Sequence, residues 1–133
     1  MPSERWTFPA TRDEVGPVRR AAVRFAREND VPDPALRDVA LAISEAVTNA
    51  VLHAYCDREP GTVTLTVEVA GDGAMEVVVA DQGRGHQPRE NSPGMGIGTE
   101  LMRRSADTVE VRPAGQGQGT EVHMTFSPGD LAT

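Results

Sequence analysis

The chain has 133 residues, a formal net charge of −7 and a single cysteine, Cys56. This length fits one domain, expected over residues 1–133, and one cysteine excludes an internal disulfide, which fits a reducing cytoplasm. No segment is long and apolar enough to span a membrane, so we expect a cytoplasmic location. The sequence contains no lysine, and an acidic chain without a dense basic segment is not expected to bind nucleic acid directly.

The N-terminal residues predict one short strand followed by a helix. Residues 5–8 are mixed in character and precede a proline, so we expect a short edge strand there. Thr11 and Glu14 have the spacing of a capping box, in which the two side chains satisfy free N–H groups at a helix start. Apolar residues then recur at helical spacing and predict a helix that runs to about Asn29.

A second helix is predicted after a break in the chain, with Asp33 as N-cap, Pro34 at its first position and an end near Tyr55. One side of this helix is apolar and is expected to meet a sheet: Leu36, Ala40, Ile43, Val47, Ala50 and Ala54. The other side carries a carboxylate, a carboxamide and an imidazole four residues apart, which form one row on a helix. The members of this polar row are Glu45, Asn49 and His53.

The polar row has two readings. Its three side chains suit a general base, a ligand for a hard metal ion and a polar support, and the nearby Leu41 and Leu52 indicate that the row is not freely solvated. An ordinary exposed helix face explains the same spacing equally well. The row alone therefore does not decide between a site and a surface.

The C-terminal half predicts four strands and a third helix. Residues 62–70 alternate polar and apolar side chains, a Gly-Asp-Gly hairpin signal follows, and residues 74–81 form a strand apolar enough to be central. A glycine-rich loop leads to a helix over 99–106, and strands follow over 108–113 and 119–126. This order predicts an α/β (α+β) two-layer sandwich, with a mixed, mostly antiparallel sheet and its helices on one face.

Glycines follow the central strand and open the third helix. Asp81 ends the strand, where it can accept a hydrogen bond from an exocyclic amine, and glycines just beyond it allow close backbone approach to a ligand; an Asp-Gly turn is the alternative. Free N–H groups at the start of the third helix favour phosphate. The spacing does not fit a Rossmann fingerprint, and a Walker loop is excluded because there is no lysine. The glycine-rich positions are Gly83, Gly85, Gly94, Met95, Gly96, Ile97 and Gly98, and Thr120 after Gly119 can support the same site.

Four sequence motifs, taken in chain order, resemble the conserved boxes of a known superfamily. They read E-A-V-T-N-A-V-L-H-A-Y, V-A-D-Q-G-R-G, G-M-G-I-G-T-E-L-M and G-Q-G-T-E-V, and they resemble the N, G1, G2 and G3 boxes of the GHKL ATPase superfamily. Within that superfamily, the compact length and the wording of the first box are similar to the anti-sigma-factor serine/threonine kinases. The resemblance covers residues from about Arg5 to Phe126 and implies a Bergerat-type ATP-binding fold.

The resemblance also implies roles for these residues and a set of partners. Glu45 would be the general base toward a substrate serine, Asn49 would hold Mg²⁺, and His53 would line the site. Asp81 would bind the adenine amine of ATP, helped by Gly85 and Thr120. The second glycine box would close over the phosphates. The implied protein is a homodimer that holds a sigma factor and phosphorylates a small anti-sigma-factor antagonist.

Two departures from the family pattern leave an alternative open. The segment from His86 to Pro93 is short for a lid, and any positive group near the transferred phosphate must be an arginine, with Arg84 and Arg89 as candidates. The alternative function is a catalytically silent, nucleotide-gated binding module that acts on a sigma factor or a related regulator. The presence of Glu45 argues for the kinase, because a pure binding module needs no base.

Overall fold

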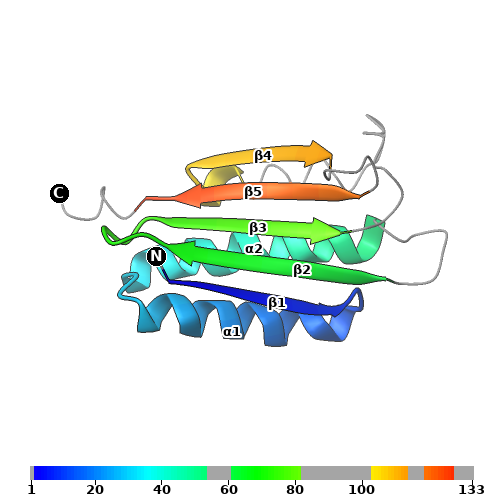
Figure 1. The fold of residues 1–133 in the computed structure, drawn as a ribbon, viewed down its shortest axis with the longest axis horizontal. Coiled ribbons are helices and arrows are strands. Elements are labelled where there is room, and N and C mark those ends of the chain that lie inside the picture. Colours follow the sequence, from blue (N-terminus) through cyan, green and yellow to red (C-terminus); the bar gives the residue numbers. More distant parts are fainter. Residues whose placement is uncertain (1, 54–60, 82–102, 114–118, 128–133) are drawn as a thin grey trace.

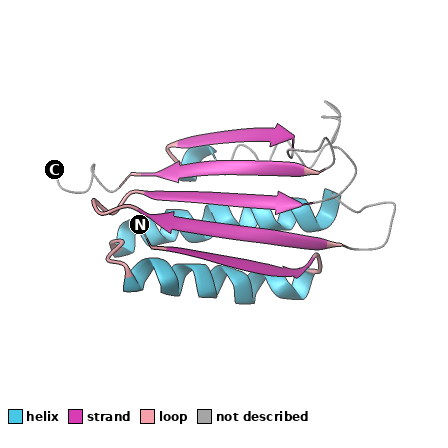
Figure 2. Ribbon diagram, viewed as in Figure 1, coloured by secondary structure: helices cyan, strands magenta, loops and turns pink. Residues whose placement is uncertain are grey.

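The computed structural model describes residues 2–53, 61–81, 103–113 and 119–127. They form two layers, with a five-stranded sheet on one side and the helices on the other (Figures 1 and 2). Within these residues, no helix is both long and apolar enough to cross a membrane. The elements are β1 (Ser3–Pro9), the 3₁₀ helix η1 (Arg12–Glu14), α1 (Val15–Glu28), α2 (Asp33–His53), β2 (Thr62–Val69), β3 (Met75–Asp81), β4 (Thr108–Pro113) and β5 (Thr120–Phe126).

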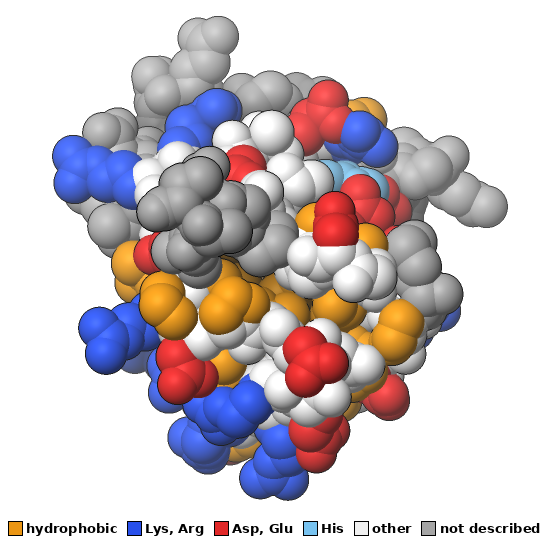
Figure 3. Space-filling model, turned by 90° about the vertical axis from the view of Figure 1, so that its left-hand side faces the viewer, with side chains coloured by type: hydrophobic (Ala, Val, Ile, Leu, Met, Phe, Trp, Pro, Cys, Tyr) orange, Lys and Arg blue, Asp and Glu red, His pale blue; other side chains and the backbone are white. Residues whose placement is uncertain are grey.

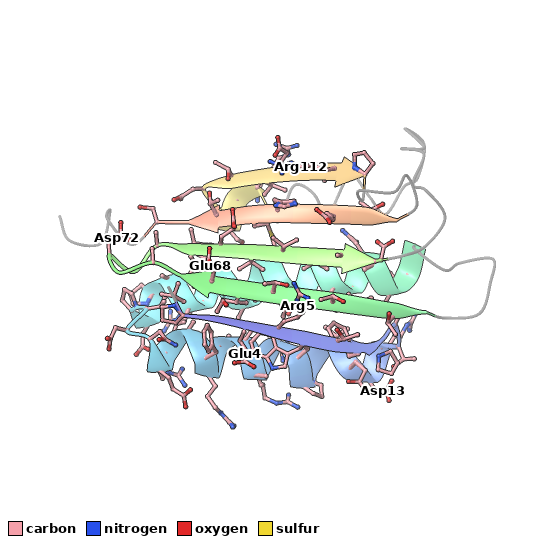
Figure 4. All side chains as sticks on the ribbon, viewed as in Figure 1. Glu4, Arg5, Asp13, Glu68, Asp72 and Arg112 are labelled. Carbon is pink, nitrogen blue, oxygen red and sulfur yellow. The ribbon has the colours of Figure 1, made fainter. Side chains whose placement is uncertain are left out.

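The sheet has the strand order β1-β2-β3-β5-β4, and each neighbouring pair is antiparallel. This confirms the predicted two-layer fold with a mostly antiparallel sheet, and it places β3 in the centre and β1 at an edge. On β2 every second residue is buried, as the alternating sequence predicts for a sheet covered on one face. No described helix covers the other face, on which Figure 4 labels Arg5, Glu68 and Arg112 on three strands.

The β2–β3 hairpin forms at the predicted Gly-Asp-Gly turn. The Gly73 N–H donates to the Ala70 carbonyl at 2.9 Å, and the Ala70 N–H donates to the Ala74 carbonyl at 2.8 Å. Gly73 has a φ of 89°, a conformation that side chains with a Cβ rarely adopt. The turn therefore requires glycine at this position and fixes the register of the two central strands.

Helix α1 begins differently from the prediction. Thr11 makes no side-chain cap hydrogen bond, and its carbonyl instead accepts the Glu14 N–H at 3.1 Å, which closes the 3₁₀ turn of η1. The α-helix starts only at Val15, with Glu14 at its N-cap. The predicted capping box is therefore wrong: both residues contribute their backbone to a tighter turn before the helix.

Helix α1 ends in a tight turn, and α2 begins a few residues later. The Val31 N–H donates to the Ala26 carbonyl and the Asp30 N–H to the Arg27 carbonyl, each at 3.1 Å. This is the Schellman pattern, and Asp30 occupies its left-handed position with a φ of 69°. The Leu36 N–H then bonds the carbonyl of the residue before Asp33, so α2 begins one residue earlier than predicted.

Helix α2 lies against the sheet through the predicted apolar side. Leu36, Ile43, Val47 and Ala50 are buried, Ala40 is half-buried, and Ala54 lies outside the described residues. On its flank toward α1, the Ser44 hydroxyl accepts a hydrogen bond from Arg19 at 3.1 Å. Helix α1 in turn packs on β1, where the rings of Trp6 and Phe25 meet edge to face with centroids 6.2 Å apart. Of the third predicted helix, residues 103–106 are described: residues 103–105 are helical and Ala106 lies in a bend.

Candidate functional site

The polar row of α2 lies on the flank that faces away from α1. Successive residues of an α-helix are about 100° apart, so Glu45 lies about 100° and Asn49 about 140° round the axis from Ser44, which bonds α1. Glu45 and Asn49 are half-buried, whereas Leu41 and Leu52 are 43% and 40% exposed. The row therefore lies at the edge of the helix–sheet contact, and the two leucines do not shield it.

His53 is the last residue of α2, and its side chain lies outside the described part of the structure. The helical backbone continues unbroken from Asn49 to His53, so the four-residue spacing keeps both on the same flank. The expected placement of the row on one helix is thus confirmed, while the role of His53 stays a prediction.

Asp81 ends the central strand and faces the helices. It is 9% exposed, and in the described residues it is the one polar or charged side chain that is buried. Directly opposite it lie Val63 of β2 and Thr120 of β5, and directly opposed residues of antiparallel strands project to the same face. A buried carboxylate is costly unless it is paired, and no buried side-chain nitrogen or oxygen among the described residues lacks a hydrogen-bond partner.

Thr120 meets Asp81 because β5 starts at that point. Gly119, just before it, is buried and has a φ of 96°, which brings the chain into the strand by a conformation that favours glycine. The carboxylate of Asp81 can accept a hydrogen bond from an amine, and the hydroxyl of Thr120 can donate or accept one. The pair forms a polar spot in an otherwise apolar row of the sheet.

The two polar sets lie toward the same end of the molecule. Helix α2 packs against β3, and Figure 1 shows the C-terminal end of α2, with Asn49 and His53, at the same end as the C-terminal end of β3, with Asp81. The remaining predicted site residues lie outside the described part of the chain: Gly83, Gly85, Gly94, Met95, Gly96, Ile97 and Gly98, together with Arg84 and Arg89.

The donor set fits Mg²⁺ bound together with phosphates. Asn49 supplies a carboxamide oxygen on this flank, and hard cations such as Mg²⁺ prefer oxygen ligands. Across the described residues, no three His, Cys, Asp or Glu side chains cluster as a metal site. Mg²⁺ is usually held by one or two protein groups and by substrate phosphates, so a single carboxamide ligand from the protein is compatible with it.

Two parts of the site could not be read from the sequence. Val63 lies beside Asp81 and gives the polar spot an apolar wall, but only the strand register shows this. The hydrogen bond from Arg19 to Ser44 marks the flank of α2 that faces α1, and so it locates Asn49 on the other flank. The signal for this pair, a serine facing an arginine on another helix, is too common to single out in a sequence.

Known proteins are similar to this chain over most of its length. The family described as histidine kinase-like ATPase domain matches residues 8–126. An anti-sigma F factor of Pasteuria penetrans is 36% identical over 129 residues, which cover 88% of this chain and 85% of that protein. The serine-protein kinase RsbW of Bacillus velezensis is 34% identical over 134 residues, which cover 89% of this chain and 81% of that protein.

Solved structures share the fold. The RsbU and RsbW domains of a Mycobacterium tuberculosis protein superpose with a TM-score of 0.75 at 23% identity, over 96% of this chain. This chain corresponds to 32% of that longer one. A blue-light activated histidine kinase of Erythrobacter litoralis superposes with a TM-score of 0.64 at 30% identity, over 77% of this chain and 33% of the kinase. The chain therefore belongs to the histidine kinase-like ATPase family, and within it to the group of anti-sigma-factor kinases.

Proposed function

We propose that this protein is an ATP-binding anti-sigma factor with serine/threonine kinase activity. It phosphorylates a small anti-sigma-factor antagonist and sequesters a sigma factor. The observation that supports the proposal is that two polar sets lie toward the same end of the fold. Asp81 and Thr120 lie opposite each other on the sheet, and the row that contains Glu45 and Asn49 runs along the helix toward the same end.

In this proposal the sheet side of the site holds the base of ATP. Asp81 accepts a hydrogen bond from the exocyclic amine of adenine, which guanine lacks at the same position, and Thr120 supports the contact. Burial of Asp81 strengthens the discrimination, because a desolvated carboxylate left without its donor costs more than one exposed to water. Gly83, Gly85 and the run from Gly94 to Gly98 are proposed to line the nucleotide and its phosphates.

The helix side is proposed to position the phosphoryl transfer. Asn49 holds Mg²⁺, which neutralises phosphate charge when bound, and His53 lines the site. Glu45 accepts the proton of the substrate hydroxyl, and its half-buried position keeps it at the border between the helix–sheet contact and the solvent from which a protein substrate approaches. Catalysis then depends on position and charge more than on covalent chemistry.

The proposal extends to assembly and location. The protein acts as a single ATP-binding domain over residues 1–133, in the cytoplasm and as a homodimer. Its partners are a sigma factor and an antagonist protein, and it binds neither nucleic acid nor membrane. The relatives named anti-sigma F factor and serine-protein kinase RsbW support the choice of partners.

The test of the kinase assignment is Glu45→Gln. We expect this variant to keep the wild-type affinity for Mg-ATP and to lose phosphotransfer by about a hundredfold or more, because the amide cannot accept the proton. Glu76→Gln is the matched control, since Glu76 is exposed on β3 and its register places it on the open face. Calorimetry measures the affinity, and intact-mass analysis of the phosphorylated partner measures the transfer.

The partner is obtained by capture from the source cell extract with Mg-ATP and, separately, with Mg-ADP. A sigma factor held with ATP, and an antagonist that gains one phosphate, support the proposal. Partners held without any mass gain would instead assign the chain to the nucleotide-gated binding modules. Transfer by Glu45→Gln at the wild-type rate would remove Glu45 as the base.

A further inference from the structure

Helix α1 carries a stripe of arginines on its outer side. Arg20, Arg24 and Arg27 are spaced at i, i+4 and i+7, so they lie within roughly 60° of arc on the helix. All three are exposed, while Val18, Ala22 and Ala26 on the opposite side are buried in the core. The stripe is about 10 Å long, at 1.5 Å of rise per residue. The stripe lies on α1, whereas the polar row lies on the flank of α2 that faces away from α1. The stripe is therefore separate from the described residues of the candidate nucleotide site.

The arginines of this stripe are largely unengaged. In the described part of the chain, neither Arg20 nor Arg24 forms an ion pair, and Arg27 has only a loose one, at 3.9 Å from Asp33 with both side chains more than half exposed. The Arg20 guanidinium lies over Gly16, where a Cβ would come within 3.2 Å of its Nη1 atom. A neighbouring arginine, Arg19, differs from the stripe because it bonds Ser44.

The charge of α1 is opposite to that of the whole molecule. Four arginines and one glutamate give this helix a formal charge of +3, in a chain with a net charge of −7. Figure 3 looks at the end of the molecule where α1 joins α2, and blue side chains gather there on its lower side, where Figure 1 places α1. Such segregation concentrates a positive potential on one helix and attracts a negatively charged partner.

The size of the stripe indicates a short acidic protein segment as that partner. A nucleic acid presents a long row of phosphates, and the net negative charge of this chain would repel it beyond the three arginines. The stripe also ends in acidic residues, Glu28, Asp30 and Asp33, all exposed, which would meet a continuing polyanion unfavourably. A partner helix with carboxylates at the same spacing can pair with each arginine. Such a helix can be short enough not to reach the acidic residues at the end of the stripe.

We propose that Arg20, Arg24 and Arg27 form a docking surface for an acidic helical segment of a partner protein. Arginine suits this role because its planar guanidinium can bind a carboxylate through two hydrogen bonds. Helix α1 is held rigidly, by the Schellman stop at one end and by contact with β1 and α2 along its length. The backbone that carries the surface is therefore pre-formed, and the loss of conformational freedom on binding falls on the arginine side chains. The inference rests on the part of the proposed function that concerns partner proteins, for which it adds a binding surface, and it needs neither nucleotide binding nor phosphotransfer.

The test uses a labelled, alanine-rich helical peptide of about 18 residues with glutamates at i, i+4 and i+7. A second peptide has glutamines at those positions. Binding is measured by fluorescence anisotropy, at low salt and again at about 150 mM salt, where exposed charge pairs are screened. The variant replaces all three stripe arginines by glutamine, which has a similar helix propensity. The matched control replaces Arg5, Arg12 and Arg112, three exposed arginines outside α1, so that both proteins have the same net charge.

We expect the glutamate peptide to bind and the stripe variant to bind it about tenfold or more weakly than wild type, from three exposed charge pairs together. The control variant should retain wild-type affinity. Equal weakening in both variants, or no binding of the glutamate peptide to wild type, would overturn the proposal. Preferential binding of a short DNA duplex to the stripe would also overturn it. Mg-ATP affinity is measured on the same samples: its absence would contradict the proposed function and leave the docking surface standing.

Discussion

At the scale of single residues, Asp81 combines a charge with burial. Val77 and Val79 of β3 are buried on the same face as Asp81. A third valine at position 81 would pack there without any desolvation cost. A carboxylate at this position is instead opposite a hydroxyl, that of Thr120. Buried polar groups of this kind are expected where a ligand is recognised, because water competes less for a hydrogen bond between the ligand and a buried group.

The prediction at this scale is that Asp81→Asn weakens Mg-ATP binding by about tenfold or more, since a hydrogen bond to a charged group contributes about 1.5–3 kcal/mol. The amide keeps the size of the carboxylate, so the fold should stay intact. Asp72→Asn is the matched control: Asp72 is exposed in the hairpin turn and accepts the Ala74 N–H through one oxygen, which asparagine retains. Calorimetry measures both variants. Unchanged ATP affinity in Asp81→Asn would contradict the assignment of the adenine contact.

The sequence predicted Asp81 itself, because a charged residue at the end of an apolar strand is visible in the chain. It also predicted Thr120 as a support for the same site, from its place after Gly119 and from the resemblance. It could not give the burial of Asp81 or the presence of Val63 next to it, because both depend on the register of three strands. Register is set by turns and core packing together, and a one-residue slip would turn Asp81 to the open face.

At the scale of elements, the patterns with a strong period were predictive and the local caps were not. The alternation in β2 and the apolar side of α2 predicted both elements because a sheet covered on one face sorts side chains by burial. The capping box at Thr11 and Glu14 was wrong because two favourable local structures compete there. The extended Thr11 leads into a 3₁₀ turn, and that turn satisfies the Glu14 N–H through the backbone.

The hairpin between β2 and β3 gives a prediction for an element. Gly73→Ala should lower the free energy of unfolding by about 1–2 kcal/mol, because alanine is disfavoured at a φ of 89°. Gly71→Ala is the control in the same turn: a Cβ there meets nothing within 4 Å, so the change should be neutral or slightly stabilising. Urea denaturation compares the two. Equal effects would show that the left-handed conformation of Gly73 does not hold the hairpin.

At the scale of the whole molecule, the core and the candidate site are placed in different parts of one fold. Ile43 of α2 lies fully buried against the sheet, whereas Asp81 lies at the end of the sheet. The core thus supports the site by holding α2 and β3 in place, and the site residues contribute to ligand binding. A substitution in one part is expected to leave the other property nearly unchanged, because distant sites act additively.

Thermodynamic linkage makes this separation measurable. A ligand that binds only the native state, at about a hundredfold above its Kd, raises the free energy of unfolding by about 2.7 kcal/mol. Ile43→Val should lower the stability by about 1 kcal/mol through lost packing, yet Mg-ATP should stabilise it by the wild-type amount.

Asp81→Asn should show the reverse pattern, with stability near wild type without nucleotide and a gain from Mg-ATP that falls to about 1.4 kcal/mol or less at the same concentration. Urea titrations of the three proteins, each with and without Mg-ATP, measure both terms. If Asp81→Asn gains as much stability as Ile43→Val, Asp81 does not bind the nucleotide. If Mg-ATP does not raise the free energy of unfolding of the wild type, the protein does not bind ATP, and the polar residues at this end of the fold have another function.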